Sequence, residues 1–178
     1  MDALFENYRT LLARVSARCG EIEAALSGHM ACRKGCSACC LNISLFPVEA
    51  VSLRLAFDTL SEDQKALALT RAAESSDEGP CPLLDGAGAC LLYGYRPVIC
   101  RTHGLPILFD DGKGNQRVDF CPENLQGLSS LSGDVMINLD PMNQMLAAVN
   151  AMFCDELFGT EAPFERLSIA DTLYLDVA

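Results

Sequence analysis

The chain has 178 residues, of which 50% are hydrophobic and 21% are charged, the balance of a globular protein that can bury a core. Its formal net charge of -11 argues against a nucleic-acid partner, because a phosphate-binding surface needs clustered Lys and Arg. Residues 1–7 lack the basic and apolar segments of a secretory signal, and no later segment has the roughly 20 apolar residues of a membrane span. We therefore expect one cytoplasmic domain over residues 1–178.

The first half of the chain predicts three helices. Apolar residues at helical spacing predict the first over residues 4–26. Pro47 is well placed as the first residue of a second helix that runs to about residue 60. Ser61 and Gln64 have the spacing of a capping box, which predicts a third helix to about residue 74.

The second half predicts less regular structure. Residues 75–101 are rich in Gly, Pro and Cys, so we expect an irregular segment with a turn of helix near Pro97. Residues 105–109 and 116–120 flank a Gly-rich turn, which predicts a β-hairpin. An apolar helix is expected over residues 141–157 and a short one from Ser168. The predicted fold class is mainly α, with a small β-hairpin and an irregular cysteine-rich metal-binding region.

Ten cysteines are the most informative feature of the composition. In a reducing compartment they indicate metal ligands or redox groups before disulfides. The pattern Cys32-x3-Cys36-x2-Cys39-Cys40 places four thiols within nine residues, and such a loop can turn two or three sulfurs toward one centre. Because Cys39 and Cys40 are adjacent, they tend to point in different directions. We expect three ligands from this loop, with the fourth thiol outside that centre or serving another one.

A second group of cysteines is spread over some forty residues and can complete a site only if the chain folds around it. Its members are Cys81, Cys90, Cys100 and Cys121. A metal there would fix a Gly- and Pro-rich stretch that cannot build its own core. The alternative for each is a small buried hydrophobic side chain, and this is our interpretation of Cys19 and Cys154, which lie on helical patterns.

Two histidines and two arginines accompany these thiols. Cys100 and His103 have a Cys-x-x-His spacing that could close on a metal, and His29 lies three residues before Cys32. The alternative for a lone His is a hydrogen bond that supports a ligand. Arg96 and Arg101 flank Cys100 and could offset the negative charge of bound thiolates, unless they are ordinary surface residues.

The order of these motifs resembles the CxxCxxCC, or YkgJ-like, cysteine-cluster family, described as a zinc- or iron-chelating domain. The resemblance covers about residues 30–125, between the N-terminal and C-terminal helices. It rests on the first cysteine loop, on Cys81-Pro82-Leu83-Leu84, and on Gly88-Ala89-Cys90-Leu91-Leu92-Tyr93-x2-Arg96-Pro97-x2-Cys100-Arg101-x2-Gly104. The first gap, of three residues, departs from the two that the family name implies. The resemblance implies a module with eight candidate thiols, namely Cys32, Cys36, Cys39, Cys40, Cys81, Cys90, Cys100 and Cys121.

The metal and the activity stay open between two classes of protein. Pro follows Cys81 and Cys121, a habit of iron–sulfur ligands, so the sequence favours an iron–sulfur cluster and a possible redox role. Eight thiols could equally form two zinc sites of four cysteines each, or one site with spare cysteines, in a non-enzymatic module that is stapled by zinc and handles metal or binds a partner. No nucleotide loop, Ser-His-Asp arrangement or zinc-protease helix indicates catalysis.

Overall fold

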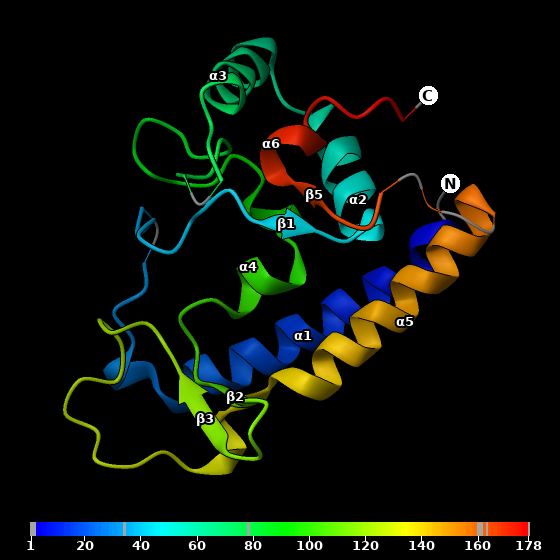
Figure 1. The fold of residues 1–178 in the computed structure, drawn as a ribbon. Coiled ribbons are helices and arrows are strands. Elements are labelled where there is room, and N and C mark those ends of the chain that lie inside the picture. The colour runs from blue at the N-terminus through cyan, green and yellow to red at the C-terminus, as the bar shows by residue number, and fades with distance from the viewer. Residues whose placement is uncertain (1–2, 34, 78, 160–161, 163, 178) are drawn as a thin grey trace.

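The computed structural model describes residues 3–33, 35–77, 79–159, 162 and 164–177, which form six α-helices and two small sheets (Figure 1). The helices are α1 (Glu6–Ala25), α2 (Pro47–Phe57), α3 (Glu62–Ala73), α4 (Val98–Thr102), α5 (Leu139–Phe158) and α6 (Ile169–Thr172). The strands are β1 (Ser44–Leu45), β2 (Ile107–Asp110), β3 (Gln116–Asp119), β4 (Ile137–Asn138) and β5 (Leu167–Ser168). The predicted mainly α fold is confirmed.

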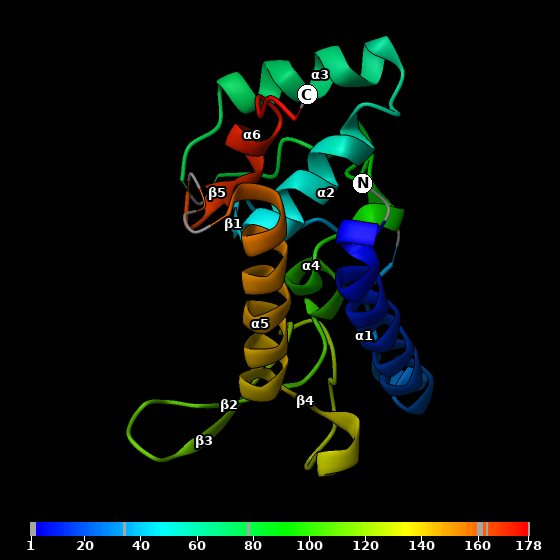
Figure 2. The same cartoon turned by 90° about the vertical axis from the view of Figure 1, so that its right-hand side faces the viewer.

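The long helices α1 and α5 lie side by side and run in opposite directions (Figures 1 and 2). α1 buries a stripe of side chains that recur every three or four residues, namely Tyr8, Leu11, Val15, Cys19 and Ile22. This spacing places them on one helical face, which packs against α5 and α4. At one end of the pair the rings of Phe5 and Phe153 have centroids 5.2 Å apart. These contacts form the first of two hydrophobic clusters.

The second hydrophobic cluster lies where α2, α3 and α6 meet. Its buried members include Leu53 and Phe57 from α2, Ala68 from α3 and Ile169 from α6. The short antiparallel pair β1–β5 brings the C-terminal segment to this cluster, and α6 begins directly after β5 (Figure 1). The pairing of β1 with β5 was not predicted, because each strand has two residues and no alternating pattern.

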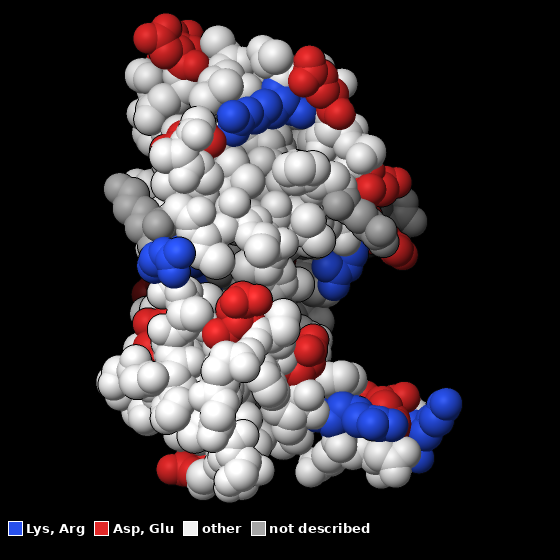
Figure 3. Space-filling model, turned by 90° about the vertical axis from the view of Figure 1, so that its left-hand side faces the viewer, with Lys and Arg blue, Asp and Glu red and all other residues white. Residues whose placement is uncertain are grey.

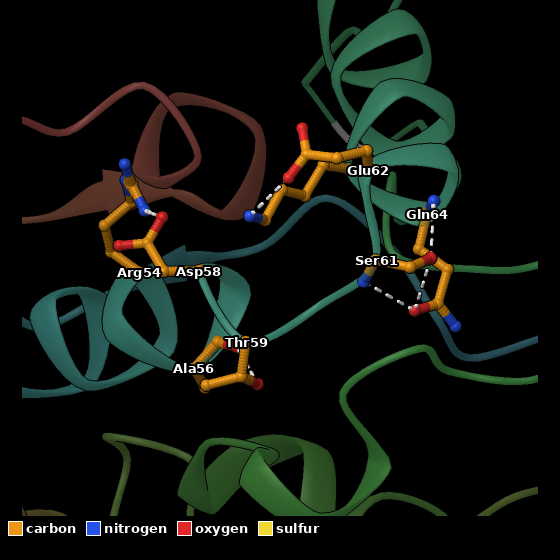
Figure 4. Close-up of polar contacts among 8 residues, drawn as sticks. Arg54, Ala56, Asp58, Thr59, Ser61, Glu62 and Gln64 are labelled. Atoms are coloured by element: carbon orange, nitrogen blue, oxygen red, sulfur yellow. Dashed lines mark hydrogen bonds and ion pairs between the residues drawn. The ribbon is translucent and has the colours of Figure 1, made fainter.

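The connection between α2 and α3 is fixed by local polar contacts (Figure 4). The backbone N–H of Gln64 donates to Ser61 Oγ at 3.3 Å, and the backbone N–H of Ser61 donates to Gln64 Oε1 at 3.1 Å. These reciprocal bonds satisfy two donors that would otherwise be unpaired at the start of α3. At the end of α2, Thr59 Oγ1 donates to the carbonyl of Ala56 at 2.7 Å. The predicted capping box is confirmed.

The predicted hairpin is formed by β2 and β3, which pair antiparallel with Ile107 opposite Asp119. β4 adds a parallel strand on the other edge of β2, a long-range pairing that local sequence patterns do not indicate. In the turn, Asp111 Oδ1 accepts hydrogen bonds from the backbone N–H groups of Lys113 and Asn115. The hairpin projects from the body of the protein with basic and acidic side chains at its end (Figure 3).

The last long helix, α5, starts two residues before the predicted Pro141. Asn138 caps it, because its side-chain oxygen accepts a hydrogen bond from the backbone N–H of Asp140 at 3.3 Å. Pro141 is tolerated in the first turn, because a backbone N–H at this position would have no intrahelical acceptor. None of the described helices combines the length and the apolar character that crossing a lipid bilayer requires.

Candidate metal centre

All ten cysteines are free thiols. Eight of them lie on or next to the loops between α1 and β4, and we divide the eight into two neighbourhoods by the backbone contacts of the segments that carry them. We call Cys40, Cys81, Cys90 and Cys100 the inner thiols. We call Cys32, Cys36, Cys39 and Cys121 the outer thiols.

The inner thiols come together through short backbone pairings between distant segments. The backbone N–H of Cys81 donates to the carbonyl of Cys40 at 2.9 Å, next to an isolated antiparallel bridge between Leu41 and Pro80. A second bridge places Cys90 opposite Leu84, three residues after Cys81. Cys81 is buried in the second hydrophobic cluster, and Cys40 and Cys90 pack against the same cluster. Two loops that are forty residues apart in sequence therefore present their thiols to one another.

The fourth inner thiol, Cys100, lies on the short helix α4. A buried carboxylate fixes α4 to α2: Glu49 Oε1 accepts a hydrogen bond from the backbone N–H of Val98 at 3.0 Å, while its Oε2 accepts from Phe46 at 3.3 Å. Glu49 is 3% exposed. Sequence reasoning missed it, because an acidic residue in the first turn of a helix is typical of a solvated position.

Two of the outer thiols, Cys32 and Cys121, lie at Gly104, which directly follows His103. A side-chain Cβ at Gly104 would lie 3.0 Å from Cys32 Sγ and 3.7 Å from the Cβ of Cys121. The backbone N–H of Cys121 donates to the carbonyl of Gly104 at 3.4 Å. Gly104 has a φ of +88°, a left-handed conformation that favours glycine. This turn thus brings the first cysteine of the early loop beside the last cysteine of the late segment.

Asn124 holds this arrangement and was not identified from the sequence. Its side chain accepts a hydrogen bond from the backbone N–H of Ala31 at 2.7 Å. It donates to the carbonyl of Gly104 at 2.7 Å and contacts Cys32 Sγ at 3.3 Å. Asn124 is 1% exposed, although nothing in the local pattern around Cys121-Pro122 marks it as buried. One amide thereby ties the early loop to the segment after the hairpin.

Burial raises the pKa of several of these thiols. It raises the pKa of Cys81 to about 12 and that of Cys39 to about 11, where the nearby Cys40 and Cys32 add to the effect. The pKa values of Cys40, Cys90 and Cys100 are raised for the same main reason. Desolvation penalises the charged thiolate, so these groups are protonated near neutral pH unless a cation compensates. A bound metal ion supplies such a cation.

The thiols are neighbours without yet forming a closed coordination site. Among the described residues, no group of three or more His, Cys, Asp or Glu side chains is placed so that it could hold a metal ion. Cys32 and Cys36 are exposed, whereas the other six of these thiols are buried or half-buried. Sulfur donors in this number fit zinc or iron, which thiolates bind readily. Closing a site around either metal requires the side chains, and above all those of the exposed loop, to turn inward.

Arg96 and Arg101 both lie beside Cys100, and their guanidinium groups bond to the protein itself. Arg101 donates to the carbonyls of Arg96 at 2.7 Å and Gly94 at 2.9 Å, and to Ser16 Oγ of α1 at 2.9 Å. Arg96 donates to the carbonyl of Cys100 at 3.2 Å, and its guanidinium lies 3.7 Å from the ring centroid of Tyr93. Both arginines therefore brace the segment from Gly94 to Cys100, and Arg96 adds positive charge near Cys40 and Cys90.

The remaining candidate residues lie at the margin of these groups. The His103 ring donates a hydrogen bond to the backbone of Cys39, and burial lowers the pKa of this histidine. His29 is exposed in the turn after α1. Cys19 is buried in the first hydrophobic cluster, and Cys154 packs against that cluster from α5. The latter two cysteines lie on the helical faces where their sequence patterns placed them.

Comparison with known proteins gives a match to a family model. Residues 31–122 match the family model CxxCxxCC, described as "Putative zinc- or iron-chelating domain". The matched segment begins just before Cys32 and ends just after Cys121, so it contains all of the inner and outer thiols. No curated protein and no solved structure matches the chain.

Proposed function

Because the chain belongs to the CxxCxxCC family, we propose that it is a metal-binding protein whose cysteine thiolates hold zinc or iron between two separated loops. The convergence of the two cysteine loops carries this proposal. Cys81 bonds to the backbone of Cys40, and Cys121 lies with Cys32 at the Gly104 turn. Packing alone does not require eight thiols within residues 32–121, and four of the eight lie within nine residues.

The metal has a structural role in this proposal. The loops that carry the thiols contain turns and isolated bridges in place of long helices or strands, so little regular hydrogen bonding holds them. Coordination by side chains from both loops ties them together, because the free energy of metal binding becomes folding free energy when the site exists only in the folded chain. Three of the inner thiols, Cys40, Cys81 and Cys90, also belong to or border the second hydrophobic cluster, so the metal would stabilise one edge of that core.

An iron–sulfur cluster is the second candidate, and it would add a redox function. Pro follows both Cys81 and Cys121, as it follows many cluster ligands. The guanidinium groups of Arg96 and Arg101, near Cys100, form hydrogen bonds with other parts of the chain, so they have a supporting role. No specific observation favours a bound substrate. We therefore propose the non-enzymatic metal module first. The exposed thiols of Cys32 and Cys36 suit a reducing, intracellular compartment.

The test is metal analysis of protein purified without oxygen, together with visible spectroscopy. Colourless protein that contains stoichiometric zinc, and that loses stability when a chelator is added, supports the structural module. Brown protein with a charge-transfer band and reversible reduction supports the iron–sulfur alternative. Protein that contains neither metal, and binds neither when it is reduced and titrated, contradicts the proposal.

Two cysteine variants sharpen this test. Cys36→Ser is expected to lower the metal content, because it removes a thiolate from the exposed loop. Cys19→Ser is the matched control, since Cys19 is buried in the first hydrophobic cluster and its loss should leave the metal content intact. Full retention of metal by Cys36→Ser would remove that residue from the ligand set.

A further inference from the structure

The separation of the thiols into two neighbourhoods points to more than one metal centre. We propose, building on the metal-binding function above, that the protein holds two separate metal centres of four cysteines each. The inner centre is formed by Cys40, Cys81, Cys90 and Cys100. The outer centre is formed by Cys32, Cys36, Cys39 and Cys121. Four thiolates are the complement of a closed tetrahedral zinc site and also of a common iron–sulfur cluster.

The inner centre is defined by backbone geometry on three sides. The hydrogen bond from Cys81 to Cys40 joins the two loops, and the bridge between Leu84 and Cys90 folds the second loop back on itself. The hydrogen bond from Leu91 to the carbonyl of Leu83, at 2.8 Å, continues this pairing. Helix α4 supplies Cys100 from the remaining side. It is held there by Glu49 of α2, which accepts a hydrogen bond from the backbone N–H of Val98 at 3.0 Å, and by Arg96, which donates to the carbonyl of Cys100 at 3.2 Å.

The outer centre is defined by the turn at Gly104. A Cβ at Gly104 would lie 3.0 Å from Cys32 Sγ, which is closer than most real Cβ contacts, so a side chain here would push the sulfur away. The same position is 3.7 Å from the Cβ of Cys121, so Cys32 and Cys121 flank one glycine. Cys39 is tied to the same turn, because the ring of His103, the residue before Gly104, donates a hydrogen bond to the backbone of Cys39.

The adjacent residues Cys39 and Cys40 mark the division between the centres. Cys39 lies within a turn that closes when the backbone N–H of Cys40 donates to the carbonyl of Ser37 at 2.9 Å. Cys40 then leads into the bridged residue Leu41, which pairs with the second loop. One thiol thus stays with the exposed loop and the next joins the buried one. Cys36 is exposed, like Cys32 in the same loop, and we assign it to the outer centre because the inner centre already has four thiols.

This division predicts a pattern of metal stoichiometry that a single site cannot give. The probe is Co²⁺, whose thiolate charge-transfer bands report each centre, added to the reduced full-length chain under anaerobic conditions. The wild-type chain should bind about two equivalents, and Cys39→Ser or Cys100→Ser should each bind about one. The double variant Cys39→Ser/Cys121→Ser, with both changes in the outer centre, should still bind about one equivalent. Cys39→Ser/Cys100→Ser, with one change in each centre, should bind none.

A variant that fails to fold is separated from one that loses a ligand by two further measurements. Far-UV circular dichroism reports whether the helices have formed. The variant Cys121→His keeps a metal ligand at that position, so it should bind both Co²⁺ ions, and only the charge-transfer bands of the outer centre should shift. Should the inner variants unfold, the outer variants decide the question, because they leave the inner thiols unchanged. Loss of all Co²⁺ from Cys39→Ser/Cys121→Ser, or its binding of two equivalents, would overturn the division into two centres. A wild-type chain that binds no metal would instead overturn the proposed function itself.

Discussion

Replacement of Asn124 by Ala tests whether one buried amide positions the outer thiols. The substitution removes the acceptor for Ala31 N–H and the donor to the Gly104 carbonyl, both at 2.7 Å, together with the contact to Cys32. A hydrogen bond contributes about 0.5–1.5 kcal/mol net, and a buried group left unpaired costs about 1–3 kcal/mol. Asn124 itself is buried, while Ala31 and Gly104 are half-buried and so partly reached by water. We expect Asn124→Ala to lower the free energy of unfolding by about 2–4 kcal/mol.

The measurement is equilibrium urea unfolding of the reduced, chelator-treated chain, with Asn115→Ala as the control. Asn115 is also an asparagine with side-chain hydrogen bonds, here to Asp111, but it lies in the exposed turn of the hairpin. Its replacement should cost no more than about 0.5 kcal/mol, as for most surface substitutions. In the metal-loaded chain, Asn124→Ala should also weaken binding by the outer thiols more than by the inner ones. Equal, small effects of the two substitutions on stability would refute the reasoning.

Three further substitutions test the surrounding structure by the same urea assay. Ser61→Ala removes the capping box of α3 and should lower stability by about 1 kcal/mol; no change would mean that the cap is not formed in solution. Gly104→Ala should cost at least about 1 kcal/mol more than Gly112→Ala, because both positions have positive φ but only Gly104 would bring a Cβ against Cys32. Equal costs would argue against the close approach of that sulfur. Arg101→Ala removes three hydrogen bonds and should lower the free energy of unfolding by about 1–3 kcal/mol. An unchanged midpoint of urea unfolding would show that stability does not depend on these contacts between α1 and the segment before α4.

Local features of the sequence were sufficient to predict most of the helices. The stripe from Tyr8 to Ile22 predicts α1 because burial of one face is repeated at every turn. The capping box at Ser61 predicts the start of α3, since both of its hydrogen bonds join residues three apart in sequence. The hairpin formed by β2 and β3 was predicted for a similar reason, because a short Gly-rich turn fixes which residues pair.

The sequence by itself also determined which chemistry to expect at the candidate site, because the number and spacing of its cysteines predict sulfur ligands without any knowledge of the fold. Only the tertiary structure decided which thiols are neighbours. The hydrogen bond between Cys81 and Cys40, and the approach of Cys32 to Gly104, join residues that are 41 or more positions apart. The tertiary structure also decided that Glu49 and Asn124 are buried. Such contacts depend on how the helices pack, and no local pattern encodes which distant backbone groups a side chain will meet.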